Sequence, residues 1–99
     1  MLIVADGEID LCTGPTFLSC LHRAMRHPSC RTLIVDLRQV RFLGARGINV
    51  LMTITLDAHA HDVRLALVAD HHTVLRPLQL TDTADHLLLF PTPDAARAP

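Results

Sequence analysis

The turn Gly44-Ala45-Arg46-Gly47, between the apolar runs LIVDL and INVLMTITL, is where chemistry is most readily placed in this sequence. In α/β domains, functional residues often follow a strand and precede a helix, where backbone N–H groups are free to bind a ligand. This turn offers no nucleophile, acid or base. Arg46 can bind an anion or an acidic protein surface. Otherwise Arg46 is a solvated side chain whose charge slightly opposes the helix dipole.

Four of the seven histidines occur as two pairs, His59 with His61 and His71 with His72. The first pair ends a predicted helix and the second follows a predicted strand, so the two pairs are expected at opposite ends of the sheet. A zinc site needs three or four ligands that converge on one point. We therefore expect solvated histidines and no metal site.

Cys12, Cys20 and Cys30 fit no metal-ligand spacing, and an odd number leaves at least one thiol unpaired. We expect reduced thiols and a cytoplasmic location, with a redox-sensitive pair as the alternative. The beginning of the sequence lacks the basic segment of a signal peptide, and no apolar run is long enough to span a bilayer. A formal net charge of −1 over 99 residues gives no sign of binding to nucleic acid or to an anionic membrane.

The apolar spacing predicts alternating strands and helices in a single domain, with strands at 2–4, 32–37, 63–69 and 87–90 and helices at 15–26, 47–60 and 70–80. Gly7 either breaks the first strand or marks a bulge. The run TLIVDL at 32–37 is apolar on both faces, which is typical of a strand between covering layers. Pro77 is expected to shorten or kink the last helix, and the tail at 91–99 is expected to fray. This order implies an α/β domain with a largely parallel inner sheet.

The order of several short motifs resembles the STAS family, the anti-sigma factor antagonists of bacteria. The motifs are GEID at 7–10, TLIVDL at 32–37, FLGARGI at 42–48, LALV at 65–68 and VLRPLQLTDTADHLLLF at 74–90. Family members carry G-E-L/I-D, a strand ending in D-L, and F-x-D-S-S-G-L at the start of a helix. The resemblance covers nearly the whole chain. It implies a mixed, largely parallel sheet of four to five strands, with three to four helices mainly on one face.

The resemblance also implies a function. In the family, the first serine of the D-S-S-G turn is phosphorylated by an anti-sigma factor that is also a kinase, and the unphosphorylated antagonist binds that kinase and frees a sigma factor. Aligning Gly47 with the family glycine places Gly44 at the aspartate, Ala45 at the phosphorylated serine and Arg46 at the second serine. Ala45 has no hydroxyl, so it cannot be phosphorylated.

From this resemblance we expect a non-enzymatic regulatory module that binds an anti-sigma factor of the serine-protein-kinase fold and needs no cofactor. Its contact surface is expected to combine Asp10 and Thr13 with residues 44–47. The Thr13 hydroxyl is a conceivable modification site, but a helix cap is its expected role. Asp82, which stands where the family usually has glycine, is a further departure from the family pattern.

The family's first edge strand is also expected to be missing, which would leave a sheet edge open for a homodimer. One alternative function is a STAS subunit of a bacterial lipid-transport ATPase, or another STAS scaffold. A second is a small enzyme that uses aspartate and histidine side chains, which requires a pocket where polar groups converge. Asp10, Asp36 and the histidines share no such site on the basis of sequence.

Overall fold

The computed structural model describes residues 1–97. The elements are β1 (Leu2–Ile9), α1 (Gly14–Met25), β2 (Thr32–Leu43), α2 (Ala45–Ala60), β3 (Arg64–Val68), α3 (His72–Leu80), the 3-10 helix η1 (Thr83–His86), β4 (Leu89–Phe90) and α4 (Pro93–Arg97). The strands form one sheet in the order β1-β2-β3-β4. The predicted α/β class is confirmed, and the pairings of the described strands are parallel rather than mixed.

β2 is the central strand and is buried on both faces. Leu33, Val35 and Leu37 belong to the main core, whereas Ile34 belongs to a smaller cluster on the opposite face. This burial accounts for the unbroken apolar run in the sequence. β2 continues to Leu43, well beyond the predicted end at residue 37, because its polar second half pairs with the end of β1. Such long-range pairing leaves no apolar pattern in the sequence.

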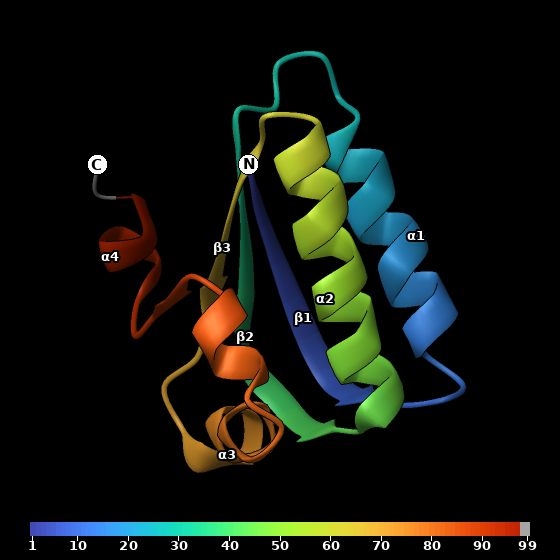
Figure 1. The fold of residues 1–99 in the computed structure, drawn as a ribbon, viewed down its shortest axis with the longest axis vertical. Helices are drawn as coiled ribbons and strands as arrows, with labels where there is room; N and C mark the ends of the chain where they lie inside the picture. The colour runs from blue at the N-terminus through green and yellow to red at the C-terminus, as the bar shows by residue number, and fades with distance from the viewer. Residues whose placement is uncertain (98–99) are drawn as a thin grey trace.

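Two helices, α1 and α2, lie side by side over one face of the sheet (Figure 1). Leu21 of α1 and both Leu51 and Ile54 of α2 are completely buried in the main core. α3 packs against β2 near its carboxyl end, and Pro77 lies inside this helix without ending it. Helices therefore cover mainly one face, as expected.

The prediction of a frayed tail at 91–99 is wrong for the part that the structure describes, because Pro93–Arg97 form α4. Its Ala96 is fully buried against Ile34, Ala66 and Val68 on the second face of the sheet. The carbonyl of Ala96 also accepts a hydrogen bond from Nη1 of Arg64 at 2.6 Å. Because a helix of this length is unstable alone, its packing on the sheet is what stabilises α4. The rest of the predicted tail, residues 98–99, lies outside the described residues.

β1 is longer than predicted, because Gly7 bends the strand instead of ending it. Gly7 has a φ of +88°, a conformation that favours glycine. The register of β1 against β2 shifts between Val4 and Asp6 and again between Gly7 and Glu8. These bulges let β1 follow the full length of β2, so both strands end at the same edge of the sheet.

Candidate functional site

The carboxyl ends of β1 and β2 are adjacent, so the two strand-to-helix loops that follow them meet at one edge of the sheet. Ile9 of β1 is paired with Leu43 of β2. The N–H of Gly44 donates a hydrogen bond to the carbonyl of Ile9 at 3.0 Å, which joins the start of α2 to the end of β1. The loops at residues 10–13 and 44–47 therefore lie next to each other.

Two glycines allow this close approach. A Cβ at Gly47 would lie 2.6 Å from Cδ1 of Leu43, 2.8 Å from Cγ2 of Ile9 and 3.1 Å from the carbonyl oxygen of Ile9. A Cβ at Gly14 would lie 2.7 Å from Cγ of Arg46, so the stem of Arg46 passes directly over the start of α1. The close packing at Gly47 fixes the start of α2 against β1, and the close packing of Arg46 on Gly14 connects the two loops.

Asp10 holds the first loop together. Its Oδ1 accepts hydrogen bonds from the N–H groups of Cys12 at 2.9 Å and Thr13 at 3.0 Å. The hydrogen bond from the Thr13 N–H lowers the pKa of the Asp10 carboxyl below its ordinary value more than any other contact does, although loss of hydration acts in the opposite direction. The Asp10 carboxylate thus binds the backbone of its own loop.

Thr13 does not cap α1 with its side chain, so that prediction is wrong. The residue occupies the N-cap position, but its backbone is already helical (φ −94°, ψ −19°) and its hydroxyl reaches no N–H of the helix. The hydroxyl instead accepts a hydrogen bond from the Asp10 N–H at 3.0 Å and donates one to the Glu8 carbonyl at 2.7 Å. Thr13 therefore stabilises the turn that precedes α1.

Seven residues from the two loops and their flanks line an open depression of about 450 Å³: Asp10, Leu11, Phe42, Gly44, Ala45, Arg46 and Asn49. We call this depression the loop surface. Thr13 lies beside it, and Gly47 is buried next to Ile9 and Leu43. Leu11 is 67% exposed and Phe42 is 50% exposed, so two large apolar side chains contribute accessible area to this depression. Sequence reasoning missed both, because an isolated apolar residue beside a loop carries no periodic signal.

The loop surface carries charges of both signs, the Asp10 carboxylate and the Arg46 guanidinium. Within residues 1–97, no carboxylate lies within ion-pair distance of Arg46. Neither α1 nor α2 has an acidic residue in its first turn. The Asp10 carboxylate accepts the N–H of Thr13 just before α1, so it is the positive end of the α2 dipole that has no acidic residue beside it in sequence. Arg46 is exposed and adds a full positive charge at the same place.

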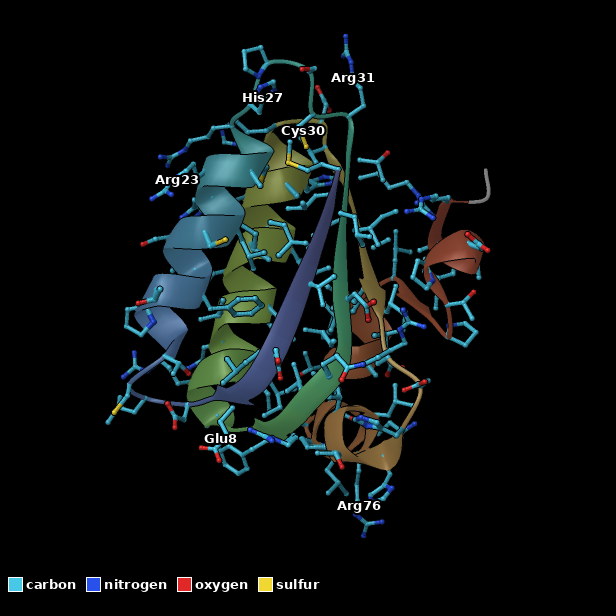
Figure 2. The ribbon with its side chains drawn as sticks, turned by 180° about the vertical axis from the view of Figure 1, so that it is seen from behind. Glu8, Arg23, His27, Cys30, Arg31 and Arg76 are labelled. Atoms are coloured by element: carbon cyan, nitrogen blue, oxygen red, sulfur yellow. The ribbon has the colours of Figure 1, made fainter. Side chains whose placement is uncertain are left out.

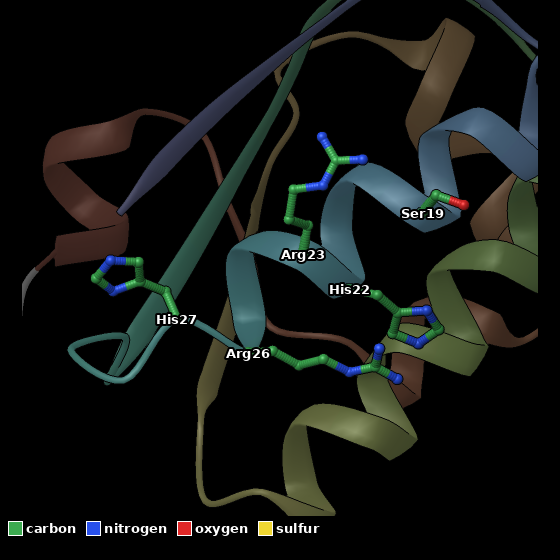
Figure 3. Close-up of a pocket in the computed structure, with 5 residues that line it drawn as sticks. All are labelled: Ser19, His22, Arg23, Arg26 and His27. Atoms are coloured by element: carbon green, nitrogen blue, oxygen red, sulfur yellow. The ribbon is translucent and has the colours of Figure 1, made fainter.

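A second concavity lies at the other end of α1 and is lined by Ser19, His22, Arg23, Arg26 and His27 (Figure 3). Nε2 of His22 and Oδ2 of Asp57 are 2.5 Å apart, so this pair connects α1 to α2. Arg23 points away from the side chains of His22 and Arg26, so the cations do not converge on one point. Figure 2 shows Arg23 and His27 at the opposite end of the molecule from Glu8, which places this concavity far from the loop surface.

The remaining polar candidates are dispersed. His59 lies at the end of α2 and His72 at the start of α3, on opposite ends of the sheet, as expected. Residues 1–97 contain no group of three or more His, Cys, Asp or Glu side chains that could hold a metal ion. Asp36 pairs with Val4 along the sheet and is therefore about 20 Å of strand away from Asp10. Asp10 and Asp36, the two aspartates considered for the small-enzyme alternative, therefore do not share a site.

Asp36 is the one buried carboxylate among the described residues. Its oxygens accept hydrogen bonds from Nε of Arg38 at 3.0 Å and from Nη2 of Arg38 at 2.8 Å. These bonds hold the pKa of Asp36 below its ordinary value, against the effect of burial. Because this ion pair lies within the sheet and is satisfied, its role is structural.

No helix among residues 1–97 is long and apolar enough to cross a membrane. No curated protein sequence gives a significant match. An anti-sigma factor antagonist from Mycobacterium paratuberculosis has a similar structure, with a TM-score of 0.85 and 28% identity over 96% of this chain and 80% of that one. The STAS domain of a SulP transporter from Vibrio cholerae has a TM-score of 0.73 and 16% identity over 96% of this chain and 75% of that one, which shows a common fold. The STAS domain family model matches residues 1–96, and the chain therefore belongs to the STAS domain family.

Proposed function

We propose that this chain is a cytoplasmic, non-enzymatic regulatory module that binds an anti-sigma factor of the serine-protein-kinase fold. The observation that carries the proposal is the loop surface, where exposed Ala45 and Arg46 stand at the first turn of α2, beside the loop that Asp10 organises. The similarity to an anti-sigma factor antagonist supports the same partner class. A subunit of a bacterial lipid-transport ATPase, or another STAS scaffold, stays the alternative, for which the SulP neighbour supports only the fold.

The loop surface offers the parts of a protein-binding site. Leu11 and Phe42 supply exposed apolar area, and Arg46 supplies a positive charge at its rim. Apolar anchors next to an arginine are typical of the residues that contribute most to protein association. Ala45 lies between them and cannot accept a phosphoryl group, so the module stays competent to bind whatever the state of the kinase.

The first experiment is capture of the tagged protein with its partners, followed by binding measurements with the purified partner. We expect a kinase-fold anti-sigma factor to bind the wild type and to bind Ala45→Asp at least about tenfold more weakly, since a carboxylate at this position introduces charge into the interface. Ala60→Asp is the matched control, because Ala60 is exposed at the other end of the same helix. Equal binding by Ala45→Asp and Ala60→Asp would exclude the loop surface.

A second experiment tests whether a hydroxyl at position 45 would allow phosphorylation to release the partner. Ala45→Ser restores a hydroxyl at the start of α2 without enlarging the surface appreciably. With the partner and ATP, we expect Ala45→Ser to become phosphorylated and to dissociate, while the wild type stays unmodified and bound. Phosphorylation of the wild type at any residue, accompanied by release, would contradict constitutive binding.

A further inference from the structure

The outer edge of β1 is a free pairing edge in the part of the chain that the structure describes. β1 is the first strand of the sheet and pairs only with β2, and Figure 2 shows it at the front of the molecule. At the other edge, β4 contributes only Leu89 and Phe90. Proteins usually protect long edge strands with proline or charged side chains. Residues 2–5 of β1 contain neither.

The hydrogen bonds to β2 show which backbone groups of β1 are free. The Met1 carbonyl accepts a hydrogen bond from the N–H of Ile34 at 2.9 Å, so Met1 directs its backbone groups toward β2. Because this direction alternates along a strand, Ile3 also faces β2, while Leu2 and Val4 direct their N–H and C=O groups outward.

The free part of the edge ends before Gly7. The register shifts on either side of Asp6 and Gly7 interrupt the alternation of the strand. Beyond them, the carbonyl of Glu8 is already occupied by the hydroxyl of Thr13 at 2.7 Å. A pairing strand can therefore bind only the first residues of β1, with Leu2 and Val4 supplying the hydrogen bonds.

The side chains of these two residues form an uncovered apolar strip. Leu2 is 41% exposed and Val4 is 57% exposed. They lie on the same face of the sheet as Ile34, which pairs with Leu2 and is buried under α4. α4 packs over β2 and β3, and none of the described helices covers this face of β1.

We propose that the β1 edge binds a second copy of this chain, strand to strand and antiparallel, about a two-fold axis that passes through Ile3. In this register Leu2 of each copy lies opposite Val4 of the other, and the outward-facing backbone groups of the two residues exchange hydrogen bonds. Both cross-strand pairs are aliphatic, and the two Ile3 side chains meet on the helix-covered face. The proposal goes beyond the proposed function, because the loop surface lies at the other end of β1.

The alternative registers are less complementary. Centring the axis on Val4 places Leu2 opposite Asp6 of the second copy, which sets a carboxylate against an aliphatic side chain. It also brings the irregular part of β1 into the pairing. The register centred on Ile3 uses only the regular, uncharged segment. Because this segment is short, the interface is small and the dimer is expected to be weak and concentration-dependent.

The test is sedimentation of the full chain from about 10 μM to about 1 mM, the range in which a small interface associates. We expect the wild type to dimerise as concentration rises and Val4→Asp to dimerise at least about tenfold more weakly. Leu56→Asp is the matched control, because Leu56 is an exposed leucine on α2 and its substitution should leave dimerisation unchanged. A wild type that stays monomeric at every concentration, or a Val4→Asp dimer of unchanged affinity, would overturn the proposal.

A charge-swap variant tests the register. Leu2→Lys combined with Val4→Asp places opposite charges across both cross-strand pairs when the axis passes through Ile3, so dimerisation should recover relative to either single variant. With the axis on Val4, the two new carboxylates would face each other and dimerisation would not recover. Binding of the anti-sigma partner should be the same for the wild type and Val4→Asp, so failure of this proposal is distinguishable from failure of the proposed function.

Discussion

Gly47→Ala should destabilise the fold at the loop surface by adding one methyl group. The three nearest atoms would lie 2.6, 2.8 and 3.1 Å from the new Cβ, all closer than ordinary contact. Two belong to the buried side chains of Leu43 and Ile9, which cannot turn into solvent. The third is the Ile9 carbonyl oxygen, which is held by the N–H of Gly44. Overpacking of this kind costs about 1–3 kcal/mol, and alanine recovers at most about 1 kcal/mol through helix propensity.

The contacts at 2.6 and 2.8 Å place the overpacking cost in the upper part of this range, about 2–3 kcal/mol. The net loss of stability should therefore be about 1–2 kcal/mol, with a decrease in Tm on the order of 4–8 °C per kcal/mol for a domain of this size. Urea unfolding followed by far-UV circular dichroism measures it. Gly44→Ala is the control, because its Cβ would meet Cε2 of Phe42 at 3.0 Å, and that half-exposed ring can move aside. If Gly47→Ala were as stable as the wild type, or Gly44→Ala equally destabilised, close packing at Gly47 would not be what fixes the start of α2.

Two further predictions concern polar groups. Arg38→Ala leaves the buried Asp36 carboxylate without its charged partner and should lower the free energy of unfolding at pH 7, by an amount that solvent around the partly exposed Arg38 reduces. Arg38 lowers the pKa of Asp36 below its ordinary value, so this stability is present above that ordinary value and is lost as pH falls through the folded-state pKa. The difference in stability between wild type and variant in urea titrations should therefore shrink as pH falls below the ordinary pKa of aspartate, and a constant difference would contradict the assignment. Thr13→Val removes the hydroxyl that binds the Asp10 N–H and the Glu8 carbonyl, and it should lower the free energy of unfolding by about 0.5–1.5 kcal/mol. Thr13→Ser keeps a hydroxyl and should retain most of this stability. Equal unfolding midpoints for the Val and Ser variants would show that the hydroxyl does not stabilise the turn.

The elements that sequence analysis predicted are those whose apolar residues repeat within the element. The helix at 15–26 has such a pattern and formed close to its expected bounds, and the apolar run at 32–37 forms the first half of the longer strand β2. The second half of β2 and the short α4 have none, because pairing with β1 and packing of Ala96 on the sheet create them. Both interactions join residues that are at least 28 positions apart in the sequence, and a local pattern does not encode them.

Sequence analysis predicted Asp10 and residues 44–47 of the candidate site, but it missed Leu11 and Phe42 and predicted none of the contacts. Alignment to the family placed Asp10 and residues 44–47 together, and parallel β1 and β2 bring them to one edge. The passage of Arg46 over Gly14 depends on how two loops meet in space, and it gives Gly14 a role that sequence alone does not suggest. Thr13 was misassigned because the residue type fits a cap, while the backbone angle that excludes capping is visible only in the structure.

The contacts that shape the loop surface do not depend on the side chain of Ala45. Gly47 sets the position of α2, and the hydrogen bonds of Asp10 and Thr13 shape the neighbouring loop. None of these contacts involves the side chain of Ala45, which is exposed at the start of α2. A hydroxyl at this position can therefore be absent or present without altering the surface. For this reason Ala45→Ser should unfold at the same urea concentration as the wild type, and any change in its behaviour toward a kinase partner would be attributable to the hydroxyl alone.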